Sequence, residues 1–200
     1  MSGFERIKQT ILVCQRGSIF FPDDFSYIGG MRMISSALRR LCADNIIIRV
    51  AQGIYCYPNI DYKFGMGILF PSIDEIAKAI AKRDKCRIAP TGSHALNLLG
   101  LSAQLQANVV YYTDGSPRRI KVGNGRGILF KHSSEMKRFS FQNEMMQLLV
   151  VALREIGEKK VNENHKKELS KFVKNIDNKE FINDLTLAPA WVQKLLKELR

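Results

Sequence analysis

Residues 30–57 carry the side chains of this sequence that are best suited to binding a polyanion. Apolar residues recur there at i, i+3, i+4 and i+7, which predicts an amphipathic helix with one apolar stripe. That stripe consists of Ile34, Ala37, Leu38 and Leu41. The opposite face carries polar side chains, none of them acidic: Arg32, Ser35, Ser36, Arg39 and Arg40. Guanidinium groups donate paired hydrogen bonds to phosphate or guanine. This face therefore indicates nucleic-acid binding, with a solvated helix surface as the alternative.

A tight β-hairpin is predicted to follow this helix. Asp44 and Asn45 break the helix, and the β-branched residues 46–50 favour a strand. Residues 51–53 form a turn, and residues 54–57 return until Pro58 stops the strand. Arg49 and Gln52, at and beside this turn, are further candidate contacts to DNA. A polar helix followed by such a hairpin is the second half of a winged helix-turn-helix, which places the helix in the major groove.

The upstream residues complete that pattern. Residues 4–14 have helical periodicity, residues 18–21 favour a short strand, and Pro22 opens a second short helix. A glycine turn at residues 28–30 then leads into the polar helix. We therefore assign residues 1–58 to a winged helix-turn-helix DNA-binding domain.

The rest of the chain favours an α+β domain. Residues 59–71, bracketed by prolines, are interpreted as a connection, and residues 72–200 as the second domain. Ser72 and Glu75 form a capping-box pattern for a helix that extends to about Arg83. A short strand at residues 86–89 and a small antiparallel meander of strands at residues 108–113, 118–122 and 127–132 are expected, followed by a helical segment from residue 144 onward.

A second basic set lies on the predicted meander. Basic and apolar residues alternate there, which predicts one buried and one positive strand face. The set consists of Arg118, Arg119, Lys121 and Arg126. It is interpreted either as additional phosphate contacts or as a solvated strand face.

Composition agrees with a phosphate-rich partner. The chain has 31 basic and 19 acidic residues, a formal charge of +12, with most of the excess before residue 140. Such a balance favours binding to nucleic acid, although an acidic protein partner also fits it. Four widely spaced cysteines without a C-x-x-C pair indicate reduced thiols rather than a zinc site or a disulfide framework. Since no apolar run is long enough to span a membrane, we expect a soluble, cytoplasmic protein without membrane association.

Enzymatic chemistry is not expected. His94, His132 and His165 fall in different elements without ligand spacing, so neither a metal site nor a cofactor is predicted. Residues 91–94, at a predicted helix start, could bind a phosphate through backbone N–H groups, or form an ordinary cap with His94 on the surface. The glycine-rich residues 123–127 lie between two strands and are interpreted as a hairpin turn rather than a nucleotide loop.

Two blocks of the sequence resemble the AbiEi-type antitoxins, transcriptional regulators of type IV toxin–antitoxin (abortive-infection) systems. The first block is ISSALRRLCADNIIIRVAQGIYCYP and the second is IAPTGSHALNLLGLSAQLQANVVYYTDGSPRRIKVGNGRGILFKH. The L-G-L-S and Y-x-T-D-G features of the second block are the more specific, because winged helices are common.

The resemblance implies a division of labour. The N-terminal domain would repress its own operon by binding inverted repeats in promoter DNA, and the C-terminal domain would neutralise a nucleotidyltransferase-like toxin without requiring a stable complex with it. The basic set around Arg118 would then be either an antitoxic surface or a phosphate contact. The alternative function is a stand-alone winged-helix regulator or nucleic-acid-binding adaptor without a toxin.

Overall fold

The chain forms a mixed α+β fold of two compact units. The computed structural model describes residues 1–104, 108–123 and 125–200, and that part of the chain contains eight α-helices and three small β-sheets. The first unit comprises residues 1–80 and 120–126, and the second comprises residues 81–119 and 127–200. The predicted connection at residues 59–71 is thus part of the first unit.

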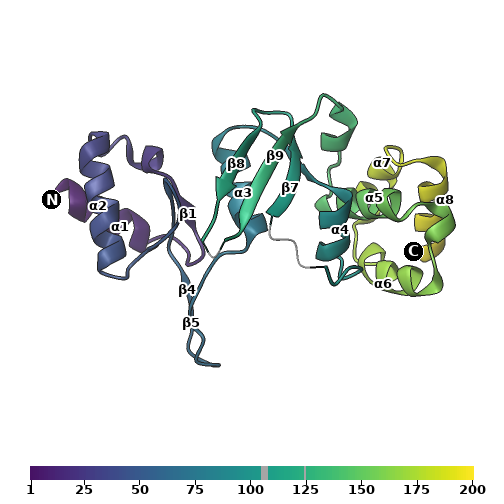
Figure 1. Ribbon diagram of the computed structural model, residues 1–200, viewed down its shortest axis with the longest axis horizontal. Helices are drawn as coiled ribbons and strands as arrows, with labels where there is room; N and C mark the ends of the chain where they lie inside the picture. The colour runs from purple at the N-terminus through teal and green to yellow at the C-terminus, as the bar shows by residue number, and fades with distance from the viewer. Residues whose placement is uncertain (105–107, 124) are drawn as a thin grey trace. The chain divides into compact units, whose positions relative to one another are not determined.

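The first unit has two helices and a three-stranded sheet at its N-terminal end (Figure 1). The antiparallel strand order is β1-β3-β2, with Ile19 and Ile48 both opposite Cys56. In chain order the elements are α1 (Gly3–Leu12), β1 (Ile19–Phe20), the 3₁₀ helix η1 (Pro22–Phe25), α2 (Met31–Ala43), β2 (Ile48–Ala51), β3 (Ile54–Cys56), β4 (Asn59–Asp61) and β5 (Gly67–Leu69).

A single apolar cluster holds α1, α2 and the sheet together. The stripe predicted for α2 is buried, and it packs with residues from α1 and η1. The least exposed members of the cluster are Ile7, Ile11, Phe25, Ile34, Leu38, Leu41 and Ile47. Burying this stripe turns the opposite face of α2 outward, and that face is the polar one.

The end of α2 sets the position of the hairpin that follows it. Asn45 adopts a left-handed conformation with φ of 55°, and the Ile46 N–H donates to the Leu41 carbonyl at 3.0 Å. This arrangement is that of a Schellman-type helix end, in which a residue such as Asn accepts positive φ at modest cost. The chain therefore turns sharply after α2, and β2 begins at Ile48.

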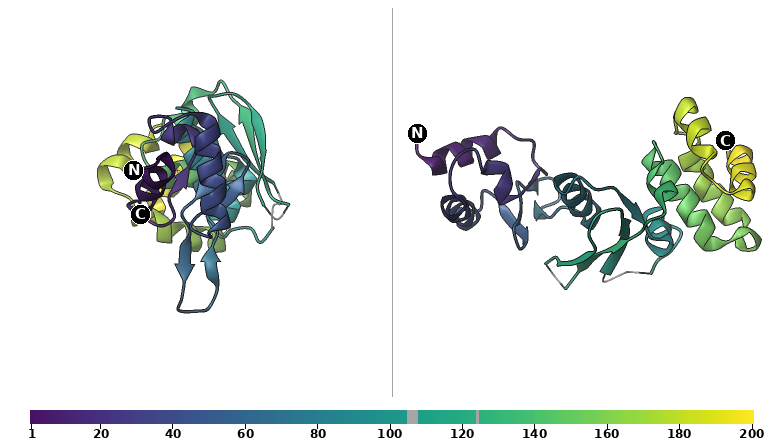
Figure 2. Two further views of the ribbon diagram at one scale, coloured as in Figure 1. Left: turned by 90° about the vertical axis from the view of Figure 1, so that its left-hand side faces the viewer. Right: turned by 90° about the horizontal axis from the view of Figure 1, so that it is seen from above.

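Strands β4 and β5 form a separate two-stranded ribbon. Asn59 lies opposite Leu69, Ile60 opposite Ile68, and Asp61 opposite Gly67 in an antiparallel register. The ribbon extends away from α1 and α2 within the first unit, as two directions of view show (Figures 1 and 2). Helix α3 (Ile73–Arg83) follows, and its predicted capping box is confirmed: the Ser72 N–H donates to Glu75 Oε2 at 2.6 Å and the Glu75 N–H donates to Ser72 Oγ at 3.1 Å.

The second unit contains a four-stranded sheet followed by helices. The strand order is β6-β7-β9-β8. The elements are β6 (Ile88–Pro90), α4 (Gly92–Leu98), β7 (Asn108–Thr113), β8 (Arg118–Lys121, which continues into the first unit), β9 (Gly127–His132), the 3₁₀ helices η2 (Met136–Phe139) and η3 (Glu158–Lys160), α5 (Glu144–Ile156), α6 (Glu163–Val173), α7 (Asn178–Leu185) and α8 (Ala190–Leu199).

The predicted antiparallel meander of residues 108–132 is wrong. Strand β9 lies beside β7 and runs parallel to it, with Asn108 opposite Gly127, and β8 lies at the outer edge of the sheet. Burial explains this order, because β7 and β9 each bury apolar side chains whereas β8 is rich in basic residues and only partly covered. An edge strand tolerates charged side chains that a central strand does not.

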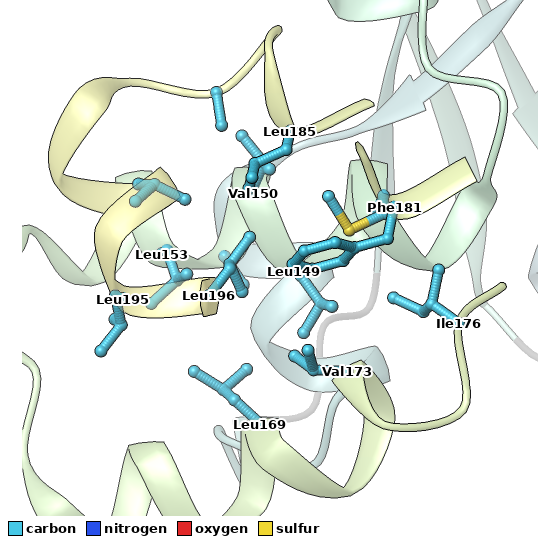
Figure 3. Packing of buried hydrophobic residues seen from close by; sticks show 14 of the residues in the cluster. Leu149, Val150, Leu153, Leu169, Val173, Ile176, Phe181, Leu185, Leu195 and Leu196 are labelled. Atoms are coloured by element: carbon cyan, nitrogen blue, oxygen red, sulfur yellow. The ribbon is translucent and has the colours of Figure 1, made fainter. Parts of the chain in front are cut away.

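The helices of the second unit enclose a large apolar core. Side chains from α5, α6, α7 and α8 point toward one another there (Figure 3). The residues labelled in that view are Leu149, Val150, Leu153, Leu169, Val173, Ile176, Phe181, Leu185, Leu195 and Leu196. The buried carboxylate of Asp184 accepts hydrogen bonds from the N–H groups of Gln142 and Asn143, which fixes the start of α5 on α7. Among the described residues, no helix combines the length and the apolar character needed to cross a membrane.

Candidate nucleic-acid interface

A groove on the first unit gathers most of the residues predicted to contact DNA. It has a volume of about 640 Å³ and lies between α2 and the β2–β3 hairpin. Its lining residues are Pro22, Arg32, Ser35, Ser36, Arg39, Cys42, Arg49, Gly53 and Tyr55. Within the described part of the chain, the charged residues of this lining are three arginines. The groove therefore presents guanidinium and hydroxyl donors from two elements of the chain.

Helix periodicity explains how α2 supplies four of these residues. Arg32, Ser35, Ser36 and Arg39 are spaced by three or four positions, so they fall on one side of the helix. All four side chains are exposed. The helix begins after Gly30, which has no side chain that could accept the first N–H groups, and its first turn holds no acidic residue. The positive end of the helix dipole is thus not offset by a carboxylate within its own first turn.

Arg49 reaches the same groove from strand β2, which is the first strand of the hairpin that follows α2. A β-bulge between Arg49 and Ala51 interrupts the pairing of β2 with β3. Gly53 completes the turn with a φ of 68°, a left-handed conformation that favours glycine. Gln52, also in this turn, is exposed but is not part of the groove lining.

Arg40 stands apart from the groove. Its guanidinium lies over the Phe4 ring, 4.4 Å from the ring centroid, and joins α2 to α1. It lines a second depression of about 550 Å³ together with Phe4, Gly30, Arg32, Met33, Ser36 and Ala37. Arg40 consequently has a packing partner, whereas Arg39 faces the groove.

The thiol of Cys42 lies within the groove lining. Burial raises the pKa of this thiol above its usual value, and the positive charge of Arg49 opposes the increase without cancelling it. The thiol is therefore neutral at physiological pH and adds no negative charge to the groove.

The second basic set is divided between the two units. Arg118 and Arg119 belong to the second unit, whereas Lys121 and Arg126 belong to the first. Arg118 pairs with Asp84 and lies 5.7 Å from the Phe130 ring centroid, and burial together with the nearby Arg83 lowers its pKa. Arg119 is exposed, with one guanidinium nitrogen donating to Asn108 Oδ1 at 3.1 Å.

Lys121 and Arg126 are exposed and flank a segment that contacts β2. The Gly123 N–H donates to the Val50 carbonyl at 3.4 Å, next in sequence to Arg49. Asn124, part of the predicted glycine-rich turn, lies outside the described residues. No local sequence pattern predicts this contact, because it joins positions more than seventy residues apart.

Two other predictions concern His94 and metal binding. His94 is buried, and its Nε2 lies 3.2 Å from the Tyr111 hydroxyl, so the placement of His94 on the surface is wrong. Its ring also meets Tyr111 edge-on, at 5.2 Å between centroids. The histidine serves the packing of α4 on β7. Among residues 1–104, 108–123 and 125–200, no cluster of three or more His, Cys, Asp or Glu side chains is arranged to hold a metal ion.

Four groove residues were not predicted as contacts from the sequence: Pro22, Cys42, Gly53 and Tyr55. Pro22, Cys42 and Tyr55 come from η1, α2 and β3 and supply the apolar part of the groove. Cys42 follows Arg39 by three positions and could have been placed by helix periodicity, whereas Pro22 and Tyr55 reach the groove only through the tertiary fold.

Comparison with known proteins gives one family assignment. No curated protein matches the chain. A family described as of unknown function, DUF6088, matches residues 6–181, a range that includes the groove and most of the second unit. The chain therefore belongs to the DUF6088 family.

Proposed function

We propose that the first unit binds duplex DNA as a winged helix-turn-helix domain. Helix α2 would enter the major groove, and the β2–β3 turn would lie against the sugar–phosphate backbone or the minor groove. The observation that carries the proposal is the convergence of Arg32, Arg39 and Arg49 on one groove, together with the hydroxyls of Ser35 and Ser36.

The electrostatics of the groove support this reading. Three guanidinium groups provide paired donors that match phosphate oxygens and the guanine edge. The neutral thiol of Cys42 leaves their positive charge unopposed at that position. Because the major groove of B-form DNA admits an α-helix and that of A-form RNA does not, the exposed face of α2 favours DNA over double-stranded RNA.

The test compares Arg39→Ala with Lys160→Ala, which removes the same charge from an exposed position in the second unit. Fluorescence anisotropy would measure binding to the duplex upstream of the protein's own gene, to a shuffled duplex and to an RNA duplex of the same sequence. We expect Arg39→Ala to weaken binding to the first duplex by about 1–3 kcal/mol if Arg39 reads a base. Lys160→Ala should leave binding unchanged. Equal affinity of the wild type and Arg39→Ala across a salt series would refute the assignment.

We further propose that the protein is an antitoxin that represses its own operon. This step rests on the sequence resemblance to AbiEi-type antitoxins, which extends over both units. The partners would be inverted repeats in the promoter and, as a functional antagonist, a nucleotidyltransferase-like toxin. Arg39→Ala would then relieve repression while preserving neutralisation, because the second function is assigned to residues outside the groove.

Co-expression of the full-length chain with the product of the adjacent gene tests the antitoxin proposal. Growth arrest by the neighbour alone, with rescue by both the wild type and Arg39→Ala, is the expected result. A harmless neighbour, or a toxic one that the wild type fails to counter, would leave the stand-alone DNA-binding regulator as the better description.

A further inference from the structure

The β4–β5 ribbon exposes several large apolar side chains that are close together in sequence. The most exposed side chains are Tyr62 at 83%, Phe64 at 75%, Met66 at 65% and Phe70 at 65%. Ile68 and Leu69 are also exposed. A two-stranded ribbon is only marginally stable in water, and β4 and β5 pair solely with each other in the described part of the chain.

The exposed apolar area of the ribbon is comparable with the apolar area that one partner contributes to a stable dimer. With about 200 Å² for a complete aromatic side chain, the three aromatic residues alone expose roughly 450 Å². Met66, Ile68 and Leu69 add further to the exposed apolar area of the ribbon. A standard interface buries about 800 Å² per partner, of which roughly 60% is apolar.

The tip of the ribbon is held in a defined shape. Asp61 Oδ1 accepts hydrogen bonds from the N–H groups of Lys63 and Phe64, at 2.8 and 3.1 Å. The Lys63 ammonium lies 5.4 Å from the Phe64 ring centroid. A loop that is already ordered loses less conformational entropy on association than a loose one.

Charge identifies the kind of partner. Residues 59–70 contain one Asp and one Lys and are therefore formally neutral, in a chain whose charge is +12. Nucleic acids and anionic lipid surfaces are bound mainly through clusters of Lys and Arg, which the ribbon does not have. Two copies of a strongly basic chain repel each other least where they meet through a neutral patch, and the cores of homodimer interfaces are depleted in charge.

We propose that the β4–β5 ribbon is a self-association surface through which two copies of this chain pair about a two-fold axis. A two-fold axis brings the same surface of each copy together. At the ribbon, each copy offers the same unpaired strand edges and the same apolar side chains. This inference depends on the ribbon alone, so it can fail or stand independently of DNA binding.

Sedimentation velocity of the full-length chain, without DNA and over a wide range of concentration, tests the proposal. We expect a monomer–dimer equilibrium, and the triple variant Tyr62→Ser, Phe64→Ser, Met66→Ser should raise its dissociation constant at least about a hundredfold. The matched control is Val13→Ser with Ile182→Ser, which removes exposed apolar side chains from other elements. Because all five positions are exposed, circular dichroism should show that the variants remain folded.

A spectroscopic reporter localises the contact. In a Trp191→Phe background, Phe64→Trp places the sole tryptophan at the ribbon, and its emission should shift to shorter wavelength as concentration rises. A monomer at every concentration overturns the proposal, as does a dimer that the triple variant leaves intact. A monomer whose ribbon tryptophan responds instead to duplex DNA or to anionic phospholipid vesicles also overturns it and assigns the ribbon to that partner.

Discussion

The guanidinium of Arg40 lies 4.4 Å from the ring centroid of Phe4, whereas Arg39, the preceding residue of α2, lines the groove. Adjacent arginines on one helix point about 100° apart, so one can pack against α1 while the other faces outward. The two residues should therefore respond differently to the same substitution.

Arg40→Ala should lower the free energy of unfolding by about 0.5–1 kcal/mol, the usual contribution of an exposed cation–π pair. Arg39→Ala should change stability by less, because its side chain is exposed along the groove. Chemical denaturation of Phe4→Leu, of Arg40→Ala and of the double variant would measure the coupling energy between the two side chains. A coupling energy near zero would show that the contact between the Arg40 guanidinium and the Phe4 ring adds nothing to stability.

Arg49→Ala should reduce the salt dependence of DNA binding. If Arg49 contacts a phosphate from the hairpin, its loss should lower the slope of log affinity against log salt by about 1 and weaken all duplexes alike. Titrations of a specific and a shuffled duplex over a range of salt concentrations would measure this. Loss of discrimination between the duplexes with an unchanged slope would instead make Arg49 a base-reading residue.

The four residues of the second basic set should fall into two pairs that differ in their effect on DNA binding. Lys121→Ser with Arg126→Ser should weaken DNA binding and lower the salt slope, because these residues flank the segment that bonds to Val50 beside Arg49. Arg119→Ser should leave DNA binding unchanged. Growth of cells that express this variant together with the toxin would show whether Arg119 has an antitoxic role. Identical DNA affinity of the wild type and the Lys121/Arg126 variant would confine the interface to α2 and its hairpin.

Arg118 requires a stability measurement instead. It pairs with Asp84 and is partly covered, so Arg118→Ser should cost up to about 1 kcal/mol of stability. Thermal denaturation beside Arg119→Ser, an exposed neighbour on the same strand, provides the comparison. Equal melting temperatures would show that the Arg118–Asp84 pair contributes no net stability.

The Arg87–Asp114 pair should make the second unit sensitive to acid. Burial alone would raise the pKa of Asp114, but hydrogen bonds from the Arg87 N–H and guanidinium, at 2.7 and 2.8 Å, lower it overall. A lowered folded-state pKa means that the stabilisation is present above the unfolded value of about 3.9 and is lost as pH falls through the folded value. Asp114→Asn should therefore be less stable than the wild type at neutral pH, and the difference should shrink below about pH 4. Melting temperatures that differ equally at both pH values would contradict this.

Local sequence patterns predicted the features that depend on apolar spacing within a helix and on helix capping. The α2 stripe follows from its apolar spacing, and the start of α3 follows from Ser72 and Glu75. Both features depend on residues within one or two helical turns. The groove was largely predictable for the same reason, since four of its residues share one face of α2.

Contacts between residues that are distant in sequence could not be predicted. The sequence does not specify that β9, rather than β8, pairs with β7, because three consecutive strands with short turns fit a meander equally well. The prolines that bracket residues 59–71 indicate a connection, and they do not reveal that its two ends pair as the β4–β5 ribbon. The sequence around His94 does not predict that Tyr111 covers this side chain, since their proximity depends on how α4 packs on β7.

The parallel pairing of β7 with β9 also affects how the chain folds. Strands β2 and β3 can pair as soon as their short turn forms, because they are adjacent in sequence. Asn108 and Thr113 must instead find Gly127 and His132 across an intervening strand, which requires closing a longer loop before any contact offsets its entropy. The hairpin of the first unit should therefore form early in refolding, and the sheet of the second unit should set the slower rate.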